Sequence, residues 1–170
     1  MEATALLIID VQRGIIEIPV HDAEGLLARL ADLMARARAA EVPVISIQHE
    51  DQELQRGTPG WEIHPAVAPQ PGEALMAKTE CDSFYNTDLA QRLAEMCVSH
   101  LIIGGCQTDW CVQTTVRRAL DLGYRVTLVS DGHSTCDSEG RTGLEIITAT
   151  NRDLTEYGAK PRRAAEVKFV

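Results

Sequence analysis

Short apolar runs alternate along this chain with longer segments of helical periodicity. The runs cover residues 5–9, 42–47, 74–77, 100–103 and 125–129, and residues 165–169 are expected to add a last strand at a sheet edge. Unbroken apolar runs of this length are typical of strands that are buried on both faces. Parallel strands need crossover connections, which are usually helices. The alternation therefore predicts an α/β fold in which helices cover both faces of a mostly parallel sheet.

Between the runs, apolar residues recur three and four positions apart, as they do on one face of a helix. Asp22 is expected to cap a helix that continues to about residue 40, and Thr87 to cap one that continues to Cys97. A third helix is expected to end at Gly123, and a fourth to begin at about Glu139.

The length of the chain indicates how many domains it forms, and its charge indicates which partners it is unsuited to bind. The 170 residues suit a single domain that spans 1–170. A net charge of −9 argues against nucleic acid or an anionic membrane as a partner, and no apolar run is long enough to cross a membrane. The first residues lack the basic and cleavage regions of a secretory signal, so a cytoplasmic location is expected.

The cysteines argue against a disulfide-rich protein, and the glycines argue against a nucleotide-binding one. The five cysteines are odd in number and irregularly spaced, which is typical of free thiols rather than of a disulfide framework. No glycine-rich dinucleotide motif follows the first apolar run, and no phosphate-binding Walker loop is present. A nucleotide cofactor is therefore not expected.

A charged or nucleophilic side chain follows three of the apolar runs. Asp10 follows the first run, Lys78 follows the third, and Cys111 stands just beyond the fourth. In an open α/β sheet the carboxyl ends of the parallel strands share one edge, where ligands bind. We therefore expect a carboxylate, an ammonium and a thiol to converge in one pocket.

These three groups have complementary chemistry. Lys78 beside Asp10 is expected to keep both side chains ionised in a partly dry site. Thr108 or Asp109 is expected to cap the helix that follows. The helix end and Lys78 are expected to lower the pKa of the Cys111 thiol, which should then react faster with alkylating reagents than the other cysteines do.

Such a constellation suits acyl transfer. Asp10 can take the thiol proton as a general base, and sulfur can then attack an amide carbon before hydrolysis. Backbone N–H groups in the turn before Cys111 can hold the oxyanion. Spacing alone also allows a different interpretation, a buried Asp–Lys ion pair beside an inert cysteine.

Several segments resemble a known family in order and spacing. They are residues 7–12 (LIIDVQ), 60–65 (GWEIHP), 78, 82–84 and 87–89, 105–112 (GCQTDWCV) and 131–135 (DGHST). This pattern resembles the isochorismatase-like cysteine hydrolases. The resemblance implies a three-layer α/β/α fold with a six-stranded parallel sheet in the order 3-2-1-4-5-6, and an Asp–Lys–Cys triad at Asp10, Lys78 and Cys111. It also implies a non-proline cis peptide, Cys106–Gln107, that directs the amides of Gln107 and Cys111 at the oxyanion.

The chain departs from two branches of that family. Nicotinamidases carry an Asp-x-His…His zinc site after the second strand, whereas residues 48–51 here are Gln-His-Glu-Asp. His49 and His64 are therefore interpreted as ordinary loop histidines, and no metal or other cofactor is expected. Isochorismatases that act on a vinyl ether lack the nucleophilic cysteine, so Cys111 argues against that activity. The resemblance also implies a homo-oligomer, either a dimer or a tetramer.

Together these features predict a cysteine-dependent amidohydrolase of a small carboxamide, ureido or lactam substrate. Substrate contacts are expected from Gln12, Trp61, Phe84 and Trp110, and specificity from the loops at 12–21, 48–72 and 80–86. Two alternatives remain open at this stage. One is a non-catalytic or redox-responsive small-molecule-binding protein with the same fold, and the other is an enzyme that acts on a C–O bond.

Overall fold

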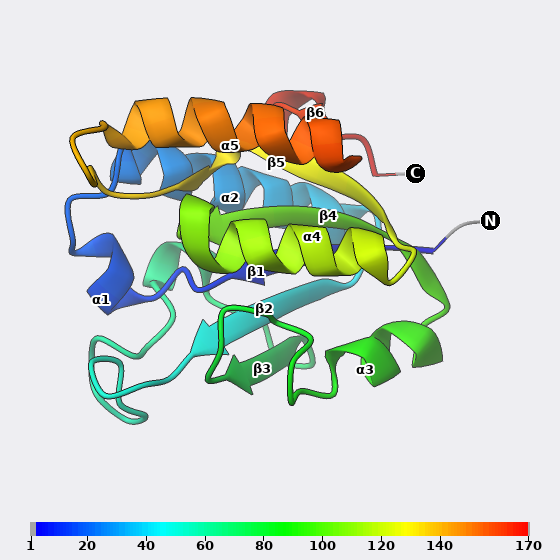
Figure 1. The fold of residues 1–170 in the computed structure, drawn as a ribbon. Coiled ribbons are helices and arrows are strands. Elements are labelled where there is room, and N and C mark those ends of the chain that lie inside the picture. Colours follow the sequence, from blue (N-terminus) through cyan, green and yellow to red (C-terminus); the bar gives the residue numbers. More distant parts are fainter. Residues whose placement is uncertain (1–2, 170) are drawn as a thin grey trace.

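The computed structural model describes residues 3–169 and has a six-stranded parallel sheet at its centre (Figure 1). The strands are β1 (Ala3–Ile9), β2 (Val44–His49), β3 (Ala74–Lys78), β4 (Val98–Cys106), β5 (Arg125–Ser134) and β6 (Lys160–Arg162). Their order is β3-β2-β1-β4-β5-β6, and each neighbouring pair is parallel. The predicted fold class and strand order are confirmed.

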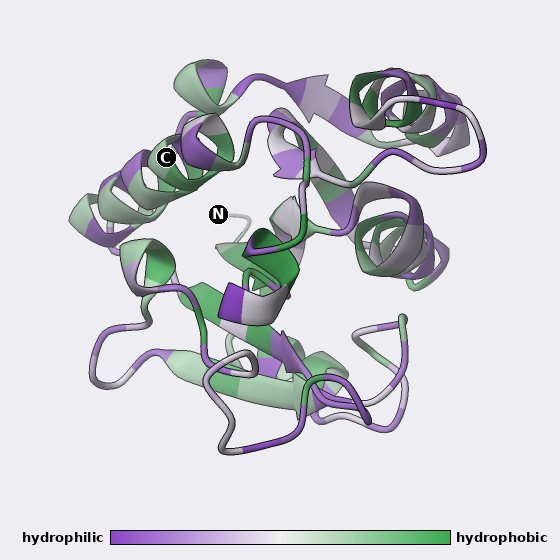
Figure 2. Cartoon of the chain, turned by 90° about the vertical axis from the view of Figure 1, so that its left-hand side faces the viewer, coloured by the Kyte–Doolittle hydropathy of each residue, from purple (hydrophilic) through white to green (hydrophobic). Residues whose placement is uncertain are grey.

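Helices cover both faces of this sheet, which gives three layers (Figure 1). They are α1 (Arg13–Ile16), α2 (Ala23–Ala39), α3 (Leu89–Glu95), α4 (Gln113–Asp121) and α5 (Gly143–Tyr157). One apolar core lies between the sheet and α2, and a second lies between the opposite face and the other long helices. Figure 2 looks onto the edge where the strands end, and the loops there are largely hydrophilic. No helix within residues 3–169 has the length and apolar character needed to span a membrane.

The start of α2 is as expected, but the ends of later helices differ from the prediction. The N-cap of α3 is Asp88 rather than Thr87. The Asp22 side chain accepts a hydrogen bond from the Gly25 N–H and starts α2, as predicted. Thr142 and Glu145 form a capping box, so α5 begins at Gly143 rather than near residue 139. Cys97 lies beyond the end of α3 and is exposed, because the chain turns there with a positive φ of 54°.

The prediction of a last strand at residues 165–169 is wrong. The sixth strand is β6, where Pro161 pairs with Leu128 at the sheet edge, a position that tolerates proline because no partner needs its missing N–H. Residues 164–166 form a 3-10 turn instead. The alternation that suggested a strand arises because Val167 and Phe169 pack against the α2 layer.

The centre of the sheet is tight where β4 passes β1. Gly105 has a φ of +130°, and a Cβ at this position would collide with the backbone of Ile9. Only glycine tolerates both the conformation and the close approach. This contact places the turn that follows β4 directly beside the residue that follows β1.

Candidate active site

Asp10, Lys78 and Cys111 meet at the carboxyl edge of the sheet. The Lys78 Nζ lies 2.8 Å from Asp10 Oδ2 and donates a hydrogen bond to Cys111 Sγ at 3.2 Å. Their exposed fractions are only 1%, 3% and 8%. The ends of three separate strands thus bring a carboxylate, an ammonium and a thiol into one nearly dry cluster.

The backbone at each strand end aims these side chains. Asp10 has a φ of 50°, in the left-handed region, and its N–H donates to the Ile47 carbonyl at 3.0 Å. Aspartate tolerates this conformation better than most residues do. Lys78 is the last residue of β3 and pairs in register with His49 of β2.

Cys111 lies in a turn of π-helical geometry, Thr108–Val112, that follows the cis peptide Cys106–Gln107. The Gln107 carbonyl accepts hydrogen bonds from the N–H groups of Trp110 and Val112 at 3.2 and 3.1 Å. The turn therefore folds back on its own first carbonyl and leads directly into α4.

The prediction that Thr108 or Asp109 caps the following helix is wrong. The Thr108 hydroxyl instead lies 2.9 Å from His133 Nδ1, and Asp109 accepts a hydrogen bond from the Thr135 hydroxyl at 2.7 Å. Both bonds tie the turn to the end of β5. The strand continues to Ser134, well beyond the predicted end at residue 129, and this extension supplies His133.

His133 is a buried neutral link in this network. Its Nε2 lies 2.9 Å from the Asn151 Oδ1. Because an amide oxygen only accepts, Nε2 carries the hydrogen and Nδ1 accepts from the Thr108 hydroxyl. Burial lowers the pKa of His133 and keeps the ring uncharged. The ring therefore connects α5 to the turn that holds Cys111.

Burial dominates the protonation states of the cluster. It raises the pKa of the Asp10 carboxyl, with Lys78 opposing this shift. Burial also disfavours the Lys78 ammonium, but the attraction of Asp10 and Cys111 outweighs it and raises the pKa of Lys78. For Cys111, burial and the negative charge of Asp10 raise the thiol pKa against the effect of Lys78.

The expected lowering of the Cys111 pKa is therefore wrong for the resting site. With Asp10 ionised and Lys78 protonated, the cluster is neutral only while the sulfur keeps its proton. A thiolate would leave a net negative charge in a nearly dry site, which is costly. The thiol is consequently protonated at rest, and a neighbouring base has to remove its proton when it reacts.

This direction predicts the pH dependence of alkylation by iodoacetamide. A raised pKa places the thiolate at alkaline pH, and only the thiolate reacts well. At neutral pH, Cys111 of the free protein should react more slowly than the exposed Cys97, and its rate should rise as the pH increases above 9. Peptide mass spectrometry of pulse-labelled protein measures both rates, and a Cys111 rate that is fastest and flat from pH 6 to 9 would contradict the assignment.

A cavity of about 390 Å³ opens beside the cluster. Its wall consists of Asp10, Gly14, Ile15, Ile18, His49, Asp51, Glu53, Leu54, Gly60, Cys81, Gln107, Trp110 and Cys111. Apart from Asp10, which follows β1, these residues come from the three loops that were expected to carry specificity and from the turn after β4. Trp110 is 60% exposed and Ile18 46%, so the wall carries two large apolar side chains that reach solvent.

Three of the four expected substrate contacts lie outside this wall. Phe84 is buried in the core and stacks on Tyr124, with ring centroids 5.8 Å apart. Gln12 is fully buried and binds the His49 backbone and the Trp61 carbonyl. Trp61 is held through that carbonyl, and its ring packs beneath Arg56. Only Trp110 remains placed to touch a bound molecule.

His49 lies at the site and was missed as a loop histidine. It is the last residue of β2, and its Nδ1 lies 3.0 Å from Lys78 Nζ. The signal available in the sequence was its position just past an apolar run, with only Gln48 between them, which is close to the signal that identified Asp10. Ligand atoms of Asp10, His49 and Cys111 lie within 4.8 Å of one another, a spacing that could hold a metal ion. The Lys78 ammonium, however, is within 3.2 Å of all three.

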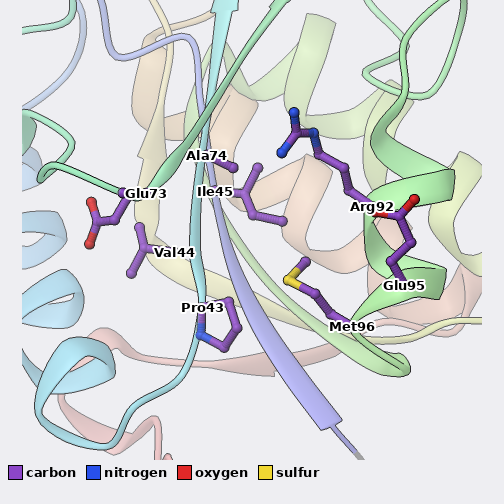
Figure 3. Close-up of a pocket in the computed structure, with 9 residues that line it drawn as sticks. Pro43, Val44, Ile45, Glu73, Ala74, Arg92, Glu95 and Met96 are labelled. Atoms are coloured by element: carbon purple, nitrogen blue, oxygen red, sulfur yellow. The ribbon is translucent and has the colours of Figure 1, made fainter.

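A second hollow of about 250 Å³ lies away from these residues (Figure 3). It is bounded by the start of β2, the start of β3 and the end of α3, with Arg92, Glu95 and Met96 on one side. It lies at the amino-terminal ends of β2 and β3, whereas Cys111 lies at the opposite edge of the sheet, where the strands end. It contains no nucleophile, so the candidate chemistry belongs to the other cavity.

Comparisons with known proteins agree with this architecture. The isochorismatase domain model matches residues 4–154. A streptothricin hydrolase of Streptomyces noursei is 38% identical over 145 residues, which cover 82% of this chain and 58% of that protein. The ureidoacrylate amidohydrolase RutB of Variovorax paradoxus is 25% identical over 169 residues, covering 75% of this chain and 67% of that protein.

A solved isochorismatase family protein has a TM-score of 0.89 and 33% identity, and the match covers 94% of this chain and 97% of that one. The chain spans only about 58% of the length of the streptothricin hydrolase, whereas it matches this solved structure almost from end to end. The domain model, the identities and the strand order all lead to the same conclusion. This chain belongs to the isochorismatase family.

Proposed function

We propose that the chain is a cysteine-dependent amidohydrolase that cleaves a non-peptide C–N bond in a small molecule. The observation that carries this proposal is the buried cluster of Asp10, Lys78 and Cys111, of which Asp10 and Cys111 line a cavity. A nucleophile, a base and a charge that stabilises both lie within contact of one another, as nucleophilic catalysis requires.

The first half of the reaction forms a thioester. Asp10 takes the thiol proton as Cys111 Sγ attacks the amide carbon, and Lys78 stabilises the negative charge that develops. The backbone N–H groups of Gln107 and Cys111 are proposed to hold the oxyanion. As the C–N bond breaks, Asp10 returns the proton to the leaving nitrogen.

The second half hydrolyses the thioester. Asp10 takes a proton from a water molecule, whose oxygen attacks the same carbon. The C–S bond then breaks, and the proton on Asp10 returns to the Cys111 sulfur. The products are a carboxylic or carbamic acid and ammonia or an amine; with a lactam the acid and the amine belong to one ring-opened product. The enzyme regains its thiol.

The size of the cavity and the nature of the relatives support a small substrate. A volume of about 390 Å³ accommodates a small molecule. Two relatives carry the names streptothricin hydrolase and ureidoacrylate amidohydrolase, which supports hydrolysis of an amide and, from the second name, the ureido class. The homo-oligomer and the cytoplasmic location stay predictions.

A substrate panel tests the proposal. Purified protein should release ammonia or an amine from small carboxamides or ureido acids, or open a lactam to its amino acid, in at least one of these classes. Intact-protein mass spectrometry after rapid acid quenching should show an acyl adduct at Cys111. Turnover without any adduct would contradict the covalent route. Saturable binding without turnover across the panel would instead favour the non-catalytic binding protein.

A further inference from the structure

The Lys78 ammonium has more acceptors than protons. Its Nζ lies 2.8 Å from Asp10 Oδ2, 3.0 Å from His49 Nδ1, 3.0 Å from the Glu80 carbonyl oxygen and 3.2 Å from Cys111 Sγ. An ammonium has three N–H donors. Four groups thus share three protons, and together they fix the position of Nζ between the carboxylate and the sulfur.

The His49 contact works only in one tautomer. Its Nδ1 has to present a lone pair to the ammonium, so the ring hydrogen has to be on Nε2. The Asp51 Oδ2 lies 3.1 Å from that Nε2. An ionised carboxylate accepts and does not donate, so Asp51 selects the Nε2–H tautomer.

Asp51 is itself held in place and in its charged form. Its Oδ1 accepts hydrogen bonds from the N–H groups of Glu53 and Leu54, both at 2.8 Å. The Leu54 contact first, and then the Glu53 and His49 contacts, lower the pKa of Asp51. A fixed negative charge therefore faces the outer nitrogen of the His49 ring.

The backbone of His49 is clamped as well. Gln12 Oε1 accepts from the His49 N–H at 2.9 Å, and Gln12 Nε2 donates to the His49 carbonyl at 2.8 Å. Gln12 is fully buried, and its Nε2 also lies 2.9 Å from the Trp61 carbonyl. The ring is consequently oriented by the protein before any substrate enters.

We infer that His49 is a positioning residue for Lys78, and that Asp51 sets the His49 tautomer. This inference rests on the proposed function. His49 contacts the ammonium rather than the reacting atoms, and its lone pair holds Nζ where it can stabilise both Asp10 and the developing charge on Cys111. The Lys78 ammonium supplies the positive charge at the centre of Asp10, His49 and Cys111.

Three variants separate this role from a merely structural one. His49→Ala removes the lone pair, whereas His49→Asn can place its amide oxygen near the position of Nδ1. Asp51→Asn keeps an oxygen for the backbone N–H groups but presents an N–H to His49 Nε2. The His49 ring hydrogen should then move to Nδ1, where its N–H would face the Lys78 ammonium instead of a lone pair. His64→Ala is the matched control, because His64 caps the 3-10 turn at 65–67 through the Ala66 N–H.

On a substrate found with the panel, His49→Ala and Asp51→Asn should each lower kcat by roughly 10- to 100-fold, because small misplacements of catalytic groups cost this much. The KM should change by less than about threefold, since neither change removes an apolar part of the cavity wall. His49→Asn should recover most of the lost kcat, and His64→Ala should match the parent chain. An unchanged kcat in His49→Ala, or equal losses in His49→Ala and His49→Asn, would overturn the inference.

A spectroscopic measurement tests the same inference without turnover. Long-range ¹H–¹⁵N correlation spectra of ¹⁵N-histidine-labelled protein distinguish the two neutral tautomers. The parent chain should show the hydrogen of His49 on Nε2, and Asp51→Asn should move it to Nδ1. A parent spectrum with the hydrogen on Nδ1 would overturn the inference. If the panel yields no turnover, the proposed function fails, while this spectrum still decides the tautomer.

Discussion

Replacing Cys111 by alanine is expected to reduce amide hydrolysis by at least about 10⁴-fold, because removal of a covalent nucleophile leaves only binding and oxyanion stabilisation. The side chain is 8% exposed and faces the Lys78 ammonium, so the substitution removes one sulfur and alters little packing. Steady-state kinetics on the best substrate measures the loss, and thermal unfolding checks that the fold persists.

Cys97→Ala is the matched control for this change. Cys97 is exposed and lies after α3 with a φ of 54°. This left-handed conformation is about as unfavourable for alanine as for cysteine, so the substitution adds no backbone strain. The variant should keep the parent kcat and KM. A Cys111→Ala protein that stays within tenfold of the parent rate would show that sulfur is not the nucleophile. A folded Cys111→Ser protein with the parent rate would lead to the same conclusion.

The strand pattern was predictable because it depends on burial alone. Residues such as Leu7 and Ile103 lie in strands covered on both faces, so each strand leaves an unbroken apolar run in the sequence. β6 leaves no such run, because it is a short edge strand that includes Pro161 and exposed cationic residues. The edge position, which only the assembled sheet defines, is what lets these residues form a strand.

The site was predictable as far as strand ends define it. Asp10 directly follows the buried residues of β1, and Lys78 is the last residue of β3; these strand ends place both side chains at one edge of the sheet. The role of His49 depends on its contacts with Asp51 and Gln12. These contacts cannot be predicted when each apolar run is interpreted separately. The pKa of Cys111 likewise depends on burial, which together with the charge of Asp10 outweighs the effect of Lys78, one of the two effects from which the sequence predicted a lowered pKa.

Lys78→Met is expected to lower the free energy of unfolding by about 3–5 kcal/mol, because removing one partner of a buried ion pair leaves an uncompensated charge. Lys78 Nζ forms an ion pair with Asp10 at 2.8 Å, and both residues are at most 3% exposed. Chemical denaturation at pH 7 measures the loss. Hydrolysis should also fall below detection, since the charge that stabilises the thiolate is gone.

The double variant Asp10→Asn/Lys78→Met separates stability from catalysis. With no charge left to bury, its free energy of unfolding should return to within about 1–2 kcal/mol of the parent value, because neutral replacements of a buried pair are often well tolerated. Hydrolysis should stay absent, since neither a base for the Cys111 proton nor a cation beside the sulfur remains. A stable double variant that still hydrolyses substrate would mean that the pair is structural and that the cysteine acts without it. Stability recovered without activity would instead show that this buried ion pair, which the fold can lose at little cost, is kept for its chemistry.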